Sequence, residues 1–281
     1  AATYMGYDFA DHPPGARIPE KPIRIAWESF HKTLHYLSQW YCSWFGITFD
    51  ANIIQLPFRL VMKWTDRTSI AEAVAMQIAR TAGMPVPKVL CYGEHLNPPF
   101  NRAFSILMTS LPGEPLENSR SPLGVEAEGS WLDELKPCLY SMRSWHPPDQ
   151  NSIFSPIRTS IWSSRVPGHV MGPFTNMDEF YEYLLAPASS HAFDSPQEYK
   201  ETLLCAKRLQ QRRHRVTFTH GDFKAHNILV DSDGHLSGFL DWGICGLVSW
   251  ILEYTTQCVL DKVAGGFRLL LGSEVINTLK S

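Results

Sequence analysis

Apolar residues recur at three- and four-residue steps in several parts of the chain, which is the spacing of one face of an α-helix. In residues 25–45 this repeat consists of Trp27, Phe30, Leu34, Leu37, Tyr41 and Trp44. A second helix is expected to begin at Ser69 and to end at Gly83 and Pro85, the usual order of stop signals. The first third of the chain therefore contains two predicted helices.

Runs of β-branched and aromatic residues around these helices predict a small sheet. Residues 47–64 are rich in such residues, and Pro57 interrupts them, so we expect two short strands rather than one. Two further strands are expected at residues 86–90 and 104–108. Helices and strands together predict a small α+β lobe.

Beyond residue 108 the pattern changes from strands to helices. Pro112, Gly113 and Pro115 interrupt it, which is typical of a connecting segment. The remainder is predicted to be mainly helical, so we expect two lobes, a small N-terminal sheet lobe and a larger C-terminal one. The predicted division is a polar N-terminal tail (1–24), an N-terminal lobe with a leading helix (25–108), a hinge (109–115) and a helical C-terminal lobe (116–281).

Three helices are expected in the C-terminal lobe. The apolar face of the first consists of Leu132, Leu135, Leu139, Met142 and Trp145. The second covers residues 178–186. The third begins after Ser195, with Pro196 in the first helical position and Glu198 completing a capping box. Residues 147–173 form a long Ser- and Pro-rich connection without a clear period.

The composition is that of an ordinary globular protein. The 281 residues include 25 Lys and Arg against 28 Asp and Glu, so the net charge of −3 favours neither nucleic acid nor an anionic membrane as a partner. Residues 1–21 are polar and Pro-rich and lack the apolar core of a signal peptide. The six cysteines are at least 13 positions apart, which predicts reduced thiols in a cytoplasmic protein.

One apolar stretch, residues 236–252, approaches the length of a membrane span. It carries Asp241 near its centre and three glycines, and a central Asp costs about 2.5–3.5 kcal/mol in a bilayer. The stretch is also shorter than the roughly 20 residues that a spanning helix needs. We therefore predict a buried strand, a loop and a helix here, and no membrane span.

The segment 216–242 carries the candidate chemistry. The loop H-G-D-F-K-A-H-N at residues 220–227 lies between two predicted strands, and a hairpin turn then returns the chain to Asp241. The hairpin is expected to bring Asp222, Asn227 and Asp241 near one another. Two carboxylates and an amide oxygen are the kind of ligands that Mg²⁺ prefers.

The spacing H-x-D-x-x-x-x-N, a hairpin and a second Asp resembles the catalytic segment of protein kinases. Gly221 and the pair Asp241-Trp242 are similar to the aminoglycoside phosphotransferase and choline kinase group. Further matching segments follow in order: L-P-F-R-L-V-M-K at 56–63, E-A at 72–73, P-V-P-K-V-L at 85–90, P-G-E-P-L at 112–116 and G-P-F at 172–174. This succession, over about residues 50–257, resembles the fungal branch of the phosphotransferase enzyme family.

The resemblance implies a two-lobed protein-kinase-like fold and ATP- and Mg²⁺-dependent transfer of phosphate to a hydroxyl group of a small molecule. Asp222 would then orient and deprotonate the acceptor hydroxyl, and Lys224 would face the γ-phosphate. Asn227 and Asp241 would hold the Mg²⁺ ion on the phosphates. We expect His220 to support the loop through backbone hydrogen bonds.

The N-terminal lobe would supply the remaining contacts to the nucleotide. By the same resemblance, Lys63 would pair with the α- and β-phosphates, and Glu72 would hold Lys63 in place. The adenine-facing hinge would consist of Met108, Thr109, Ser110 and Leu111. Ser69-x-x-Glu72 is also a capping box, so the Glu72 carboxylate either pairs with Lys63 or caps the helix.

Two departures from the family pattern keep a second hypothesis open. Residues 47–62 contain no glycine, so phosphates would lack the close backbone cover of a Gly-rich loop. Gly243 stands where many relatives have an acidic residue. The alternative is a degenerate kinase fold that binds a nucleotide or a partner without turnover.

Other residues allow weaker interpretations. A metallohydrolase using His220, Asp222, His226 and Asn227 is a third hypothesis, although such sites need further His and Asp clusters. His226 is expected to pack or hydrogen-bond rather than to bind a ligand. The acidic residues of the second predicted C-terminal helix are expected to form a solvated face; they are Asp178, Glu179 and Glu182. The acceptor substrate and the oligomeric state are not readable from the sequence.

Overall fold

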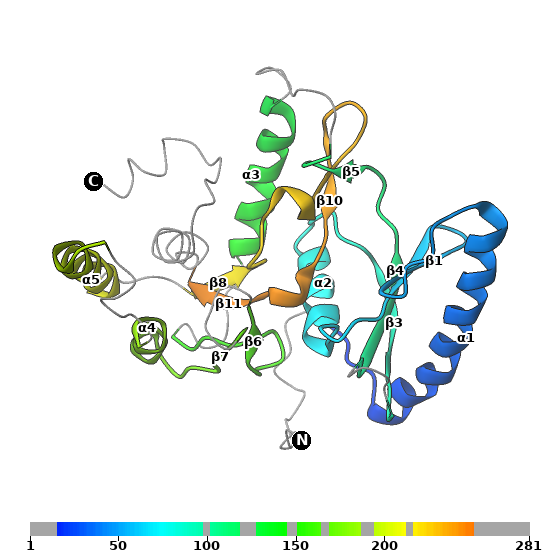
Figure 1. The fold of residues 1–281 in the computed structure, drawn as a ribbon, viewed down its shortest axis with the longest axis horizontal. Helices are drawn as coiled ribbons and strands as arrows, with labels where there is room; N and C mark the ends of the chain where they lie inside the picture. The colour runs from blue at the N-terminus through cyan, green and yellow to red at the C-terminus, as the bar shows by residue number, and fades with distance from the viewer. Residues whose placement is uncertain are drawn as a thin grey trace.

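The computed structural model describes residues 16–97, 102–118, 128–144, 151–163, 169–186, 194–211 and 216–249. They form a small antiparallel sheet with two helices, followed by helices and short strand pairs (Figure 1). The predicted two-lobed α+β fold is confirmed. The N-terminal elements are α1 (Lys21–Phe45), β1 (Ile53–Leu56), β2 (Leu60–Lys63), α2 (Ile70–Thr81), β3 (Val89–Glu94) and β4 (Phe104–Thr109).

The N-terminal sheet has the strand order β1-β2-β4-β3, and all neighbouring strands are antiparallel. Because side chains alternate between the two faces of a strand, Met62 and Leu107 lie in one apolar cluster with residues of α1 packed against it. Ile106 and Met108 lie in the main core with the apolar face of α2. Figure 1 accordingly shows α1 and α2 on opposite sides of the sheet.

Helix α1 begins at Lys21, four residues before the predicted start, so the polar tail is shorter than expected. The reason is Pro22, which lies in the first turn, where its missing N–H costs no hydrogen bond. The helix ends at Gly46, whose φ of 63° is left-handed and whose N–H donates to the carbonyl of Cys42.

The predicted strand at 86–90 is shifted in the structure to Val89–Glu94. Pro85 and Pro87 have no N–H to donate to a neighbouring strand, so pairing starts only beyond them. The two short strands on either side of Pro57 and the strand from Phe104 are confirmed.

The described part of the C-terminal lobe combines three α-helices and two one-turn helices with three small strand assemblies, ordered β10-β9-β5, β11-β8 and β6-β7. The strands are β5 (Glu114–Pro115), β6 (Ile161–Trp162), β7 (Val170–Met171), β8 (Val216–Thr219), β9 (Ile228–Val230), β10 (Leu236–Phe239) and β11 (Gly246–Ser249). The helices are α3 (Glu128–Ser144), α4 (Met177–Leu185), α5 (Pro196–Gln211) and the one-turn helices η5 (Ala225–Asn227) and η6 (Trp242–Ile244). The segment 109–115, predicted as a hinge, connects β4 to β5, and the domain boundaries themselves stay predictions.

The three predicted C-terminal helices are confirmed within a residue or a few of their expected positions. The Ser195 hydroxyl accepts a hydrogen bond from the Glu198 N–H at 3.1 Å, which is the predicted cap. The stretch 147–173, predicted as irregular, contains β6 and β7. Trp145 and part of that stretch lie outside the described residues.

The stretch 236–252 differs from its prediction, because a strand follows the loop where a helix was expected. After β10 and η6, β11 pairs antiparallel with β8, in the register Gly246 to Thr219 and Ser249 to Val216. All four residues of β8 are buried, so their backbone groups need a partner strand. Residues beyond 249 lie outside the described part of the chain.

Two findings on membrane spans and disulfides apply to the described residues. None of the helices there has the length and apolarity needed to cross a bilayer. The cysteines with described side chains, which form no disulfide, are Cys42, Cys91, Cys138 and Cys245.

Candidate active site

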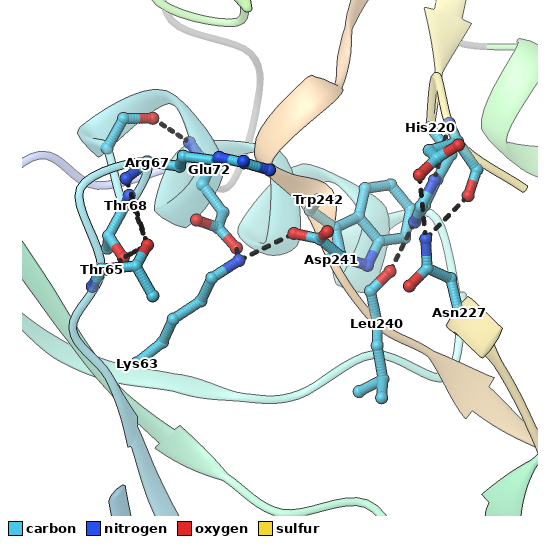
Figure 2. A network of polar contacts seen from close by, with 12 residues as sticks. Lys63, Thr65, Arg67, Thr68, Glu72, His220, Asn227, Leu240, Asp241 and Trp242 are labelled. Carbon is cyan, nitrogen blue, oxygen red and sulfur yellow. Dashed lines mark hydrogen bonds and ion pairs between the residues drawn. The ribbon is translucent and has the colours of Figure 1, made fainter. Parts of the chain in front are cut away.

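Lys63, the last residue of β2, is the point where the two lobes meet (Figure 2). Its ammonium nitrogen lies 2.7 Å from Glu72 Oε1 on α2 and 2.7 Å from Asp241 Oδ1, which follows β10. The Glu72 side chain is 2% exposed, while that of Asp241 is 47% exposed. The predicted pairing of Lys63 with Glu72 is therefore present, and Asp241 joins it.

Glu72 takes part in the cap with its backbone and in the ion pair with its side chain. The Glu72 N–H donates to the Ser69 hydroxyl at 3.3 Å. The carboxylate uses Oε1 for Lys63, and the buried Oε2 has no hydrogen-bond partner. The two alternatives from the sequence are thus resolved in favour of the ion pair, with Ser69 alone supplying the capping side chain.

The three charges shift one another's pKa values. Burial would lower the pKa of Lys63, but Glu72 and Asp241 outweigh it and hold the pKa above its ordinary value. Burial raises the pKa of Glu72, and Lys63 opposes that rise. At Asp241 burial is outweighed by Lys63, so the pKa of this carboxyl lies below its usual range. A cationic Lys63 and an anionic Asp241 face each other at neutral pH.

His220 is the first residue of the loop 220–227 and is completely buried. Its Nε2 lies 2.8 Å from the carbonyl oxygen of Leu240, and its Nδ1 accepts the Asp222 N–H at 3.2 Å. These two bonds require the tautomer that carries the proton on Nε2. The predicted support of the loop through backbone hydrogen bonds is confirmed.

Asp222 is almost fully buried, and Asn227 and Lys224 both contact it. The Asn227 amide nitrogen donates to the Asp222 carbonyl at 3.0 Å and to its Oδ2 at 3.3 Å. The Lys224 ammonium lies 3.1 Å from Asp222 Oδ1. Figure 2 shows the Asn227 nitrogen turned toward these acceptors and its amide oxygen on the other side.

The backbone of Leu240 connects this loop to Asp241. The Leu240 N–H donates to the Asn227 carbonyl at 2.9 Å, and its own carbonyl accepts from His220 (Figure 2). Asp241 follows with a left-handed φ of 57°, a conformation that Asp tolerates better than most residues. Trp242 is buried with its ring 4.5 Å from that of His220. The hairpin thus brings Asp241 to Lys63, a contact that was not predicted, while the predicted approach of Asp241 to Asp222 and Asn227 stays a prediction.

Two glycines lie near the site, and only Gly221 is required by its backbone conformation and close contacts. Gly221 has a φ of 84°, and a Cβ there would lie 2.6 Å from the Ile244 carbonyl oxygen, so no other residue fits. A Cβ on Gly243 would lie 3.6 Å from Asp241 Oδ1 and 3.7 Å from Glu72 Oε2. An acidic side chain at 243 would therefore start beside two carboxylates that already share one lysine.

The predicted adenine-facing segment, residues 108–111, is partly engaged by the protein itself. The Met108 side chain is buried in the main core. The Thr109 hydroxyl accepts the Lys88 N–H at 2.9 Å, and the Ser110 N–H donates to the Arg59 carbonyl at 2.7 Å. The nucleotide role of this segment stays a prediction.

The lack of a Gly-rich loop before Lys63 goes together with a different arrangement of strands in front of this residue. In protein kinases the corresponding lysine lies on the third strand, whereas in the described part of this chain a single strand, β1, precedes the strand of Lys63. Helix α1 comes before β1, and the connection ends at Ala51 and Asn52. Both residues bind the Arg102 guanidinium, at 3.2 and 3.0 Å, so this connection is fastened to the sheet.

Arg67 lies beside the candidate active site but was not among the site residues predicted from the sequence. It lies on the loop between β2 and α2, with its guanidinium 4.6 Å from the centre of the Trp162 ring on β6. Figure 2 shows its side chain extending past Glu72 toward Asp241. The sequence signal that could have identified Arg67 is its position, four residues after Lys63 and two before the capping Ser69. Its partner Trp162, however, is distant in sequence.

Other candidate residues have local roles. His226 is exposed, and its Nδ1 lies 3.8 Å from Glu117 Oε2, which is too far for a hydrogen bond, so its expected packing or hydrogen-bonding role stays a prediction. The Glu179 carboxylate accepts from Thr175 at the start of α4, and Asp178 accepts from Gln210. Across the described ranges no three His, Cys, Asp or Glu side chains converge as a metal site, so the metallohydrolase hypothesis has no ligand set there.

A strand lysine paired with a helix glutamate, and an H-x-D-x-x-x-x-N loop whose hairpin returns an aspartate to that lysine, define a protein-kinase-like fold and site. The chain belongs to the phosphotransferase enzyme family, whose model matches residues 53–258. The predicted family is thereby confirmed, while the fungal branch stays a prediction.

Solved structures resemble the chain only distantly. An apo form of a thermostable mutant of aminoglycoside phosphotransferase APH(4)-Ia is 14% identical, with 81% of this chain and 83% of that chain covered and a TM-score of 0.49. A ternary complex of a mutant of the same protein with AMP-PNP and hygromycin B is also 14% identical, covers 80% and 81%, and has a TM-score of 0.47. No curated protein matches the chain.

Proposed function

We propose that the protein is an ATP- and Mg²⁺-dependent phosphotransferase that moves the γ-phosphoryl group to a hydroxyl group of a small molecule. The observation that supports this most is the Lys63 ammonium, which bridges Glu72 and Asp241. This bridge puts the candidate phosphate-binding cation beside the candidate metal ligand. Membership of a family of phosphotransferase enzymes supports the reaction class.

In this proposal Asp222 acts on the acceptor. Its carboxylate accepts the hydroxyl proton while the hydroxyl oxygen forms a bond to the γ-phosphorus. The bond from that phosphorus to the oxygen it shares with the β-phosphate breaks, and the electron pair leaves with ADP. Lys224, 3.1 Å from Asp222, supplies positive charge for the transferred group, and Lys63 supplies it for the α- and β-phosphates.

Asn227 and Asp241 fit a magnesium ion. The Asn227 nitrogen is used by Asp222, so its oxygen is the end left for a cation. Asp241 uses Oδ1 for Lys63 and is half exposed, which leaves its second oxygen for the same purpose. Mg²⁺ is usually held by one or two such oxygen ligands together with phosphates. When bound, the ion would neutralise charge on the β- and γ-phosphates.

The degenerate binding fold is the second candidate. One observation favours it, namely that a single described strand precedes β2 and that residues 51–52 are fastened by Arg102. Backbone cover for phosphates from a Gly-rich loop is therefore not provided by the described residues.

Replacement of Asp222 separates the two candidates. Asp222→Asn keeps the shape of the side chain and removes the base, so turnover should fall about 10²–10⁴-fold, with nucleotide affinity nearly unchanged. Asp233→Asn is the matched control, because Asp233 lies in an exposed turn of the β9–β10 hairpin. Turnover is measured against a panel of hydroxyl- and amino-bearing small molecules, and affinity by calorimetry.

Two results decide against the enzyme. Wild type that binds ATP but transfers no phosphate to any acceptor, with background ATP hydrolysis equal in Asp222→Asn, supports the binding fold. Wild type that binds no nucleotide removes the enzyme and leaves only the partner-binding form of the degenerate fold.

A further inference from the structure

Helix α1 carries a second apolar face whose large side chains stay 44–70% exposed in the described part of the chain. The buried face of the helix includes His31, Ser38 and Cys42, which lie against the sheet. The other face, here named the α1 stripe, consists of Ile23, Phe30, Leu37, Trp40 and Trp44, which are 44–70% exposed. Large apolar side chains gathered in this way on a protein surface mark an interaction site.

The spacing of the α1 stripe is that of a helix–helix contact. Ile23, Phe30, Leu37 and Trp44 are each seven residues apart, so they run nearly straight along the helix. The positions three residues after the first three of them are Ala26, Thr33 and Trp40, and all three are exposed. Such an alternation of three and four residues is the seam along which two helices pack.

The area of the α1 stripe matches what a stable dimer needs. Aromatic side chains present about 150–250 Å² each, so the exposed parts of the stripe, with Tyr36 and Phe45 beside it, amount to roughly 800 Å². A standard interface buries about that area on each partner.

The charges of α1 point to a protein partner rather than a bilayer. Residues 33–45 contain no Asp, Glu, Lys or Arg. In the first half Arg24 pairs with Glu94 at 2.9 Å and Lys32 with Glu28 at 2.6 Å, and Lys21, at the start of the helix, lies 3.8 Å from Glu94. An interfacial membrane helix is typically rich in Lys and Arg along its polar face, whereas a neutral seam is suited to an identical neutral seam.

The sizes along the seam fit one orientation. Its small residues, Ala26 and Thr33, lie in the N-terminal half, and its tryptophans, Trp40 and Trp44, lie in the C-terminal half. Antiparallel packing about a two-fold axis places Trp44 beside the partner's Ala26, so large fills small. Parallel packing would oppose tryptophan to tryptophan and leave gaps at alanine.

We propose that the α1 stripe is a homodimer interface at which two copies of the chain pack their first helices antiparallel. The interface is isologous, so the same residues serve on both copies. It lies on the side of the sheet away from α2 (Figure 1), and it is independent of the proposed phosphoryl transfer.

Sedimentation velocity of the full chain over about 1 to 100 μM tests this proposal. Wild type should show twice the chain mass of 31.9 kDa. Leu37→Glu should weaken the dimer about 30-fold or more, since it buries a charge at the centre of the seam, and Leu37→Met should retain it. Tyr140→Glu is the matched control, because Tyr140 is 80% exposed on α3, and it should sediment as wild type.

Trp44→Glu, near the helix end, gives an independent disruption if Leu37→Glu lowers the melting temperature of the single chain. A wild-type monomer at 100 μM overturns the proposal, whether or not that monomer binds phosphatidylcholine vesicles. A dimer that persists equally in Leu37→Glu and Trp44→Glu overturns it as well.

Discussion

At the scale of single residues, Lys63 is the side chain that forms two ion pairs in the candidate site. One ammonium serves two carboxylates, one buried and one half exposed. The buried Glu72 cannot keep its charge without this partner, because removal of one member of a buried pair leaves the other without solvation or counter-charge. The lysine is therefore as important for the stability of the empty protein as for any ligand.

Lys63→Met should lower the free energy of unfolding by about 3 kcal/mol. The double variant Lys63→Met with Glu72→Leu should recover most of that loss, because it removes the orphaned carboxylate. Lys32→Met is the control, since its pair with Glu28 lies on the surface and is worth less than about 1 kcal/mol. Urea unfolding measures all three, and a double variant no better than the single one would contradict this account.

The residues of the site were predictable where a side chain carries the role. The loop spacing identified Asp222, Asn227 and Asp241, and the structure brings Asp222 to Asn227 and Asp241 to Lys63. The choice between the two positions of the Glu72 carboxylate needed coordinates, because Ser69 and Lys63 are both within reach of that residue. Arg67 was missed since its ring partner, Trp162, is distant in sequence.

At the scale of elements, a buried polar cluster fastens α1 to the sheet. The Ser105 hydroxyl on β4 lies 2.6 Å from His31 Nδ1 and 2.8 Å from His95 Nε2. His31 Nε2 also lies 3.3 Å from the Cys91 sulfur on β3. Burial lowers the pKa of His31 to about 4, and it likewise lowers the pKa of His95 to about 4.

This cluster predicts an acid-sensitive N-terminal lobe. Both folded-state pKa values lie below the ordinary 6.5, so between pH 6.5 and about 4 the unfolded chain binds more protons than the folded one. Stability is then complete above pH 6.5 and is lost on acidification, by up to about 1.4 kcal/mol per pH unit for each histidine.

Unfolding in urea between about pH 7 and pH 5 measures that slope. The double variant His31→Gln and His95→Gln should flatten it, whereas His226→Gln, which changes an exposed side chain, should keep it. Equal slopes in wild type and the double variant would show that other groups cause the acid sensitivity.

Element boundaries were predictable where local chemistry decides them. The Ser195 cap, the break at Pro57 and the hairpin at Asp233-Gly234 all depend on one or two residues. The strand β11 was predicted as a helix because an apolar run carries no period of its own, and only its pairing with β8 settles the matter. The start of α1 was predicted four residues too late, although the first turn of a helix accepts Pro22.

At the scale of the whole molecule, the two lobes meet through charges at Lys63 and through α2, which contacts η6. A ligand that binds both Lys63 and Asp241 therefore stabilises the molecule across its lobes. At 100 times its dissociation constant, ATP with Mg²⁺ should add about 2.7 kcal/mol and raise the melting temperature by about 5 °C. Asp241→Ala should remove the part of this rise that depends on Mg²⁺, as scanning fluorimetry with and without the metal can show.

AMP is the control ligand for that measurement, because it lacks the β- and γ-phosphates and should give the same small shift with and without Mg²⁺. A Mg²⁺-dependent rise that survives in Asp241→Ala would assign the metal to other residues.

The hydrogen bonds of Leu240 have a consequence for how freely the sequence around the site can vary. Both bonds that carry Asp241 into place use main-chain atoms, the Leu240 N–H toward Asn227 and its carbonyl toward His220. Any L-amino acid supplies these two atoms, and proline alone lacks the donor. Position 240 can therefore accept many side chains during evolution or library selection, while a proline there would uncouple the hairpin that carries Asp241 from the loop that carries Asp222.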